Sequence, residues 1–101
     1  MINIIKFFSP KDCWYYLDDK EKIDFIKLYD KKNDEFIEKG AELIGTYVSR
    51  ANSDWSRYEI WLFNDIENNI SYSNILEEIG FYEYFVVQNL LGFKTNNLDL
   101  G

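Results

Sequence analysis

The sequence contains no histidine, and only one cysteine and one proline among its 101 residues. The lack of histidine excludes a histidine general base, a histidine-containing catalytic triad and histidine ligands for zinc or haem. The single cysteine, Cys13, excludes an internal disulfide and a cysteine cluster for zinc or iron–sulfur. We therefore predict no cofactor and no metal site, and the sequence assigns no catalytic residue.

Positive charge is scarce as well, because 11 Lys and Arg face 18 Asp and Glu, for a net charge of −7. A nucleic-acid partner would require a basic patch, and a membrane span would require a long apolar run; the sequence shows neither. A lone thiol without a secretion signal is typical of the reducing cytoplasm. We therefore expect an acidic, cytoplasmic protein that binds neither nucleic acid nor membranes. The frequent Ile, Asn, Lys and Tyr favour a bacterial origin.

Hydrophobic residues are plentiful, at 47% of the sequence, and aromatic residues reach 19%. This apolar share is that of a globular domain and is well above that of a disordered chain. The length fits a single domain. We expect this domain to cover residues 1–95 and a polar tail to follow at 96–101.

Hydrophobic periodicity and turn residues predict two helices and four strands. In chain order we expect a strand at 2–8, a helix from 18 to 40, strands at 42–50 and 56–63, a helix at 72–79 with a further helical turn after it, and a strand at 86–94. The two middle strands are joined by a short, turn-rich linker, which predicts an antiparallel hairpin.

Local signals define the helix ends. Asp18, with Glu21 three residues later, predicts a capping box, and Gly40 predicts the end of the first helix. For the second helix, Ser71 predicts the start and Gly80 the end. Six residues of the first helix share one stripe at helical spacing, and we expect them to face the core: Ile23, Ile26, Tyr29, Asn33, Phe36 and Ile37.

The predicted order β-α-β-β-α-β is that of the ferredoxin-like fold, an α+β fold with a four-stranded antiparallel sheet and two helices on one face. The other sheet face is then uncovered. On the strand at 56–63, Trp61 and Phe63 share a face, and we expect them, with Tyr47, on the uncovered side. Because large exposed apolar patches are rare in monomers, we predict a homodimer that packs sheet to sheet.

Three segments carry a family resemblance: WYYLD at 14–18, YEIWLFND at 58–65 and GFYEYF at 80–85. With the order of elements, they resemble the dimeric α+β barrel superfamily, including darcynin-like bacterial families of unknown function. The resemblance implies a dimeric α+β barrel. It also implies a role within the range of that superfamily, which includes cofactor-free monooxygenases, lactone isomerases, haem-degrading enzymes and small ligand-binding domains. The lack of histidine disfavours its haem-binding and histidine-dependent members.

The candidate ligand-binding residues include three that share one face of a predicted strand, namely Arg57, Glu59 and Trp61. A guanidinium and a carboxylate beside a large aromatic ring could anchor the polar group of a ligand in an apolar pocket. Alternatively, Arg57 and Glu59 form a structural ion pair near the strand end. A desolvated guanidinium requires an anionic partner, so Arg57 must pair with Glu59, with Glu83 or with a ligand.

The other candidates are aromatic or polar residues near the sheet. Tyr47, Tyr82 and Tyr84 could donate phenolic hydrogen bonds to a substrate oxygen, or they could pack in the core with the hydroxyl satisfied. Asn89 could hold a ligand carbonyl or a turn. Trp14 could cover a flat aromatic ligand, or it could fix the first helix on the sheet. We expect any small molecule to lie between the sheet and the second helix.

Two functions remain open at this point. The first is a small-molecule-binding dimeric α+β barrel. If it is catalytic, we expect a cofactor-free oxygenase or isomerase that acts on an aromatic or polyketide-like compound. The second is a non-catalytic, acidic binding module that docks on a protein partner or sequesters a metabolite.

Overall fold

Four antiparallel strands form one sheet in the computed structural model, which describes residues 1–50 and 54–95. The strands are β1 (Ile2–Pro10), β2 (Glu42–Val48), β3 (Arg57–Phe63) and β4 (Phe85–Phe93). Their order across the sheet is β2-β3-β1-β4, so β1 and β3 are the two central strands. The predicted tail at 96–101 and part of the hairpin linker lie outside the described residues.

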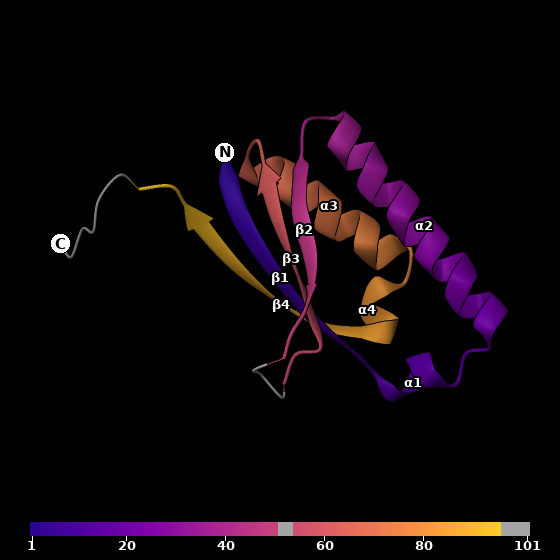
Figure 1. The fold of residues 1–101 in the computed structure, drawn as a ribbon. Helices are drawn as coiled ribbons and strands as arrows, with labels where there is room; N and C mark the ends of the chain where they lie inside the picture. Colours follow the sequence, from indigo (N-terminus) through magenta and orange to yellow (C-terminus); the bar gives the residue numbers. More distant parts are fainter. Residues whose placement is uncertain (51–53, 96–101) are drawn as a thin grey trace.

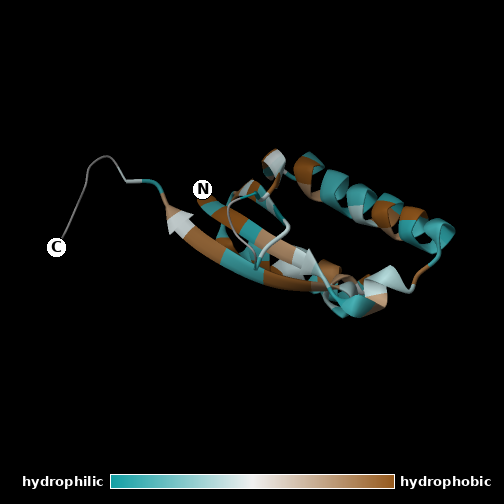
Figure 2. Ribbon diagram, turned by 60° about the horizontal axis from the view of Figure 1, so that its bottom comes forward, coloured by the Kyte–Doolittle hydropathy of each residue, from teal (hydrophilic) through white to brown (hydrophobic). Residues whose placement is uncertain are grey.

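The helices lie on one side of the sheet and leave the other side open (Figures 1 and 2). They are α1 (Asp12–Tyr15), α2 (Asp19–Glu38), α3 (Ile66–Glu78) and α4 (Phe81–Tyr84). The two long helices, α2 and α3, are the pair that the periodicity predicts. The order and the sheet topology confirm the ferredoxin-like α+β fold. In the described part of the chain, no helix is long and apolar enough to cross a membrane.

The helix ends follow the local signals with one exception. Asp18 and Glu21 form the predicted capping box, and Gly40 and Gly80 adopt the positive φ angles of 108° and 87° that favour glycine at a helix end. The predicted start of the second helix is wrong, because α3 begins at Ile66 rather than near Ser71. The side chain of the preceding residue, Asp65, accepts a hydrogen bond from the Asn68 amide at 2.8 Å and caps the helix.

The predicted apolar stripe of α2 is only partly buried. Tyr29, Asn33 and Phe36 are buried, whereas Ile23 and Ile26 are 51% and 47% exposed. The reason is the position of α2, which stands apart from the sheet along part of its length (Figure 1). This position leaves open a cleft, which is described below.

The prediction that Trp61 and Phe63 lie on the uncovered sheet face is wrong. Both are fully buried on the helix-covered face, where their rings lie 5.0 and 5.4 Å from the ring of Tyr72 on α3. Alternation along β3 predicts which side chains share a face, and Arg57, Glu59, Trp61 and Phe63 do so. It does not predict which of two apolar faces the helices cover.

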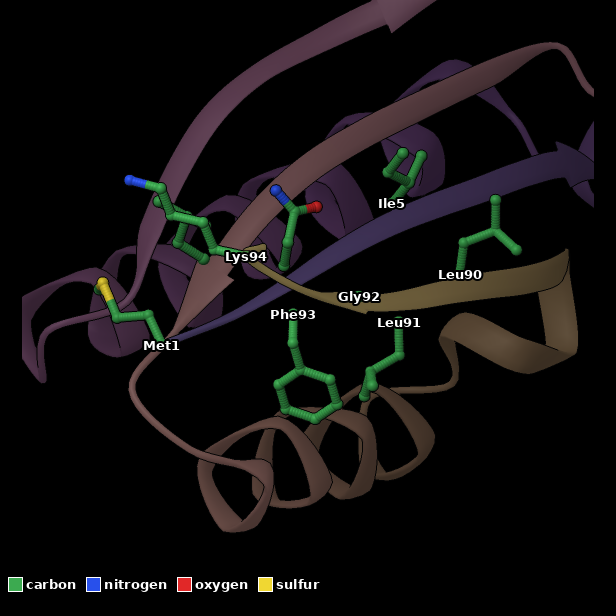
Figure 3. A pocket seen from close by; sticks show the side chains of 9 residues that line it. Met1, Ile5, Leu90, Leu91, Gly92, Phe93 and Lys94 are labelled. Atoms are coloured by element: carbon green, nitrogen blue, oxygen red, sulfur yellow. The ribbon is translucent and has the colours of Figure 1, made fainter. Parts of the chain in front are cut away.

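The uncovered side of the sheet, called the open face here, is apolar nevertheless. It includes Asn3, Ile5 and Phe7 of β1, Tyr58, Ile60 and Leu62 of β3, Tyr47 of β2 and Val86, Gln88 and Leu90 of β4. Tyr47 lies there as predicted and stacks on Tyr58, with ring centroids 5.0 Å apart. In Figure 3, Ile5 and Leu90 project from this side of the sheet, while Leu91 and Phe93 project from the other.

Candidate functional site

A cleft of about 620 Å³ lies between α2 and the sheet. Its walls come from alternate residues of β2 and β3, from one side of α2, and from parts of β1, α1, α4 and β4. Five aromatic rings without a polar group form one part of the wall: Phe8, Trp14, Phe25, Phe81 and Phe85. The polar part consists of Tyr29, Asp30, Asn33, Thr46, Ser56, Arg57 and Glu59. Mostly apolar walls with a few polar groups are typical of small-molecule sites.

A buried ion pair lies behind the polar part of the cleft. Lys6 of β1 and Glu59 of β3 are direct partners in the antiparallel register, and their side chains are only 2% and 3% exposed. The Lys6 Nζ atom lies 3.0 Å from Glu59 Oε1. The register of β1 and β3 therefore brings opposite charges together on the helix-covered face.

Aromatic residues complete the environment of the Lys6 ammonium group. It donates hydrogen bonds to the hydroxyl groups of Tyr29 and Tyr72. Tyr72 in turn donates to Asn33 Oδ1 at 2.7 Å. The ring centroids of Tyr29 and Phe81 lie 4.7 and 4.8 Å from Lys6 Nζ, within the range of cation–π attraction. All three ammonium protons thus have a partner.

Burial has a clear effect on the pKa values of this cluster. Loss of water lowers the pKa of Lys6 to about 8, although the charge of Glu59 and its hydrogen bond act in the opposite direction. Burial raises the pKa of Tyr29 and Tyr72 well above 10.0, and nearby negative charge on Glu59 adds to both shifts. The two phenols therefore stay protonated at neutral pH and act as hydrogen-bond donors.

The two oxygens of Glu59 have unequal partners. Oε1 accepts hydrogen bonds from Lys6 Nζ, from the Tyr29 hydroxyl at 2.8 Å and from Trp61 Nε1 at 2.8 Å. Oε2 lies 2.7 Å from the same Tyr29 hydroxyl. Trp61, one of the predicted ligand-binding residues, is thus a positioning residue that holds Glu59 rather than part of the cleft wall.

Of the other predicted site residues, the structure brings Trp14, Arg57 and Glu59 together around the cleft. Arg57 is exposed at the rim and has no carboxylate within 4.0 Å among the residues that the structure describes. Glu59 pairs with Lys6 instead. Because the Arg57 guanidinium is exposed to water, it does not need the anionic partner that the sequence predicts for a desolvated guanidinium. Tyr84 packs edge-on against Trp14, with centroids 5.7 Å apart.

The remaining predicted residues lie elsewhere. Tyr47 is on the open face, so the sheet separates it from the cleft. Tyr82 and Asn89 line a narrow crevice beside α3, which has a volume of only about 10 Å³. The space beside the second helix is thus nearly filled, and the larger cavity on this side of the sheet lies beneath the first long helix.

The sequence predicts Tyr29 and Asn33 on the core side of the first helix, but it does not predict that they join Lys6 and Tyr72 in a buried polar cluster. A weak signal existed for two of these residues. Lys6 is the only charged residue of β1, and Asn33 is a polar residue on the apolar stripe of α2. Neither signal predicts which side chains Lys6 and Asn33 contact. Within 1–50 and 54–95, no three Asp, Glu or Cys side chains lie together in a way that could hold a metal ion.

A protein-family model matches the chain over residues 1–99 and is described as a family of unknown function, DUF6616. The chain belongs to the DUF6616 family. Among curated proteins, no sequence matches it.

This DUF6616 chain is similar in fold to several solved structures. The putative chlorite dismutase TA0507 has a TM-score of 0.71 at 20% identity; the match covers 90% of the DUF6616 chain but only 43% of the length of TA0507. An uncharacterised NIPSNAP domain protein from Burkholderia xenovorans has a TM-score of 0.55 at 13% identity over 98% and 99% of the two chains. HapK from Hahella chejuensis has a TM-score of 0.57 at 13% identity over 100% and 99%. These likenesses confirm the ferredoxin-like α+β fold that the resemblance implies, whereas the closer likeness to darcynin-like families stays a prediction.

Proposed function

We propose that this DUF6616 protein binds a small, largely apolar ring compound in the cleft between α2 and the sheet. The observation that carries the proposal is the cleft itself, which has a volume of about 620 Å³ and a wall that combines aromatic rings with a few polar groups. Volumes of this size are typical of small-molecule sites. Arg57 at the rim favours a ligand that carries an anionic group, because no carboxylate in the described part of the chain pairs with it.

The catalytic and non-catalytic forms of this function share the same cleft. A cofactor-free isomerase or oxygenase would use Glu59 and Tyr29, a carboxylate and a phenol that both line the cavity, to move a proton. A binding module would use the same walls to sequester a metabolite. Both forms require binding of a ring compound, so a binding experiment tests what they have in common.

Titration with 2-naphthoate, a flat aromatic anion, is the test of this proposal. We expect saturable binding by isothermal titration calorimetry. Thr46→Trp should abolish it, because Thr46 lines the cleft beside Glu59, its partner in the β2–β3 register, and a tryptophan there would fill the space. Arg57→Met should weaken binding about two- to fivefold, the effect of losing one exposed ion pair.

Arg50→Met is the matched control for Arg57→Met, because Arg50 lies near the same hairpin but does not line the cleft. Its affinity for 2-naphthoate should equal that of the wild type. Undiminished binding by Thr46→Trp would show that the naphthoate site is not in this cleft.

We also propose that the open face mediates a homodimer. Exposed apolar residues gather on it, among them Tyr47 and Leu90, which are 39% and 51% exposed. A hollow of about 600 Å³ lies beside them, lined in part by Ile5, Leu62 and Leu90 (Figure 3). A second copy of the same face would cover this apolar surface by twofold symmetry.

Sedimentation velocity at micromolar concentration should give twice the mass of one chain for the wild type and the mass of one chain for Leu90→Lys. Leu90 is half exposed, so the substitution places a charge in the interface without disturbing the fold of one chain. Ile23→Lys on α2 is the control, because Ile23 is equally exposed but lies away from the open face. A wild type that sediments as one chain would contradict the dimer.

A further inference from the structure

We infer that Glu59 makes the cleft selective for hydroxylated ring compounds, because the Oε2 atom of Glu59 accepts a hydrogen bond from a ligand hydroxyl group. This inference rests on the proposed function and specifies the ligand class of the same site. It follows from the number of hydrogen-bond donors around the carboxylate, from the charge beside it and from its place in the cleft wall.

The Glu59 carboxylate has more acceptor positions than hydrogen-bond donors around it. An ionised carboxylate offers about four acceptor positions, two on each oxygen. Four donor–acceptor contacts reach Glu59, but only three protons supply them, because the Tyr29 hydroxyl contacts both oxygens with one proton. Lys6 and Trp61 both donate to Oε1. Acceptor capacity is therefore left on Oε2.

The buried donors next to Glu59 are already used, and Arg57 has no carboxylate within 4.0 Å among the described residues. The three protons of the Lys6 ammonium group go to Tyr29, Tyr72 and Glu59. The Tyr72 hydroxyl donates to Asn33. A further donor for Oε2 must therefore come from the cleft, whose wall includes Glu59. Buried carboxylates are stabilised by each additional hydrogen bond they accept.

The charges around Glu59 limit which ligand group can bind to it. Lys6 already neutralises Glu59 at 3.0 Å, and Arg57 adds a positive charge at the rim. A ligand ammonium group at Oε2 would lie close to the Lys6 ammonium and be repelled by it. A ligand carboxylate or ether oxygen can only accept hydrogen bonds, and the ionised Glu59 carboxylate has no proton to donate to it. A neutral hydroxyl group adds no positive charge beside Lys6 and can donate a hydrogen bond to Oε2 of Glu59.

A series of three compounds tests this inference without any change to the protein: 2-naphthoate, 6-hydroxy-2-naphthoate and 6-methoxy-2-naphthoate. Hydrogen bonds to charged groups strengthen binding by about 10- to 100-fold. We expect the hydroxyl compound to bind more tightly than 2-naphthoate by a factor in that range, and the methoxy compound to bind no more tightly than 2-naphthoate. Equal affinity of the hydroxyl and methoxy compounds would overturn the inference while leaving the proposed function intact. Failure of all three to bind would instead contradict the proposed function.

A double variant assigns the preference to Glu59. Glu59→Leu alone would leave Lys6 buried and unpaired, so Lys6→Met/Glu59→Leu removes both charges together. The ratio of the affinities for the hydroxyl compound and 2-naphthoate should fall to about one in this variant, because leucine accepts no hydrogen bond. A ratio that stays at the wild-type value would show that another group recognises the hydroxyl. Circular dichroism shows whether the variant folds; if it does not, the compound series on the wild type still decides.

Discussion

Lys6→Met should lower the free energy of unfolding by about 3–5 kcal/mol, the usual effect of leaving one member of a buried ion pair without its partner. Glu59 is 3% exposed at its side chain, and Lys6 is its only cationic partner in the described part of the chain. Removal of the ammonium group also leaves the hydroxyl groups of Tyr29 and Tyr72 without their donor. Urea unfolding followed by circular dichroism measures the change.

The double variant Lys6→Met/Glu59→Gln should recover most of this loss, because it removes both charges while the glutamine oxygen still accepts from Trp61. Lys27→Met, at an exposed position of α2, is the control and should change the free energy of unfolding by less than about 0.5 kcal/mol. If the Lys6→Met protein were as stable as the wild type, Glu59 would not be a buried and unpaired charge in that variant. This result would contradict the observed burial of Glu59.

Trp61→Ala should lower the free energy of unfolding by about 3–5 kcal/mol, as is usual when a fully buried tryptophan is truncated. The Trp61 ring is 0% exposed and stacks on Phe63 at 5.4 Å between centroids. The substitution also removes the Trp61 hydrogen bond to Glu59, so the buried carboxylate loses one of its donors.

Trp55→Ala is the matched control for Trp61→Ala, because Trp55 is only partly buried and lies on the other side of the sheet, with its ring centroid 6.2 Å from that of Phe7. We expect its effect on stability to be clearly smaller. Equal effects of the two substitutions would contradict the placement of Trp61 in the core between the sheet and α3.

The order of elements could be predicted from the sequence because its signals are local. The capping box at Asp18 and Glu21 and the stops at Gly40 and Gly80 depend only on residues within one helical turn. The start of α3 lies earlier than predicted, because Asp65 lies just after the end of β3 and caps the helix there.

The buried cluster could not be predicted, because its members are far apart in the sequence. Lys6 and Glu59 meet only through the register of β1 and β3, and Tyr29 and Tyr72 reach them from two different helices. Alternation correctly placed Glu59 beside Arg57 on one face of β3. The choice of the covered face depends on how the helices pack over two apolar surfaces, and this is a tertiary property that alternation does not contain.

The most direct test of binding in the cleft is to map the site of 2-naphthoate by the shifts of backbone amide signals in nitrogen-15 NMR spectra during titration. Two hollows of similar volume compete, because the cleft beneath α2 has about 620 Å³ and the hollow on the open face about 600 Å³. Binding in the cleft predicts the largest shifts at Thr46, Val48 and Glu59, which line it. Largest shifts at Ile5, Leu90 and Gly92, which line the hollow on the open face, would contradict it.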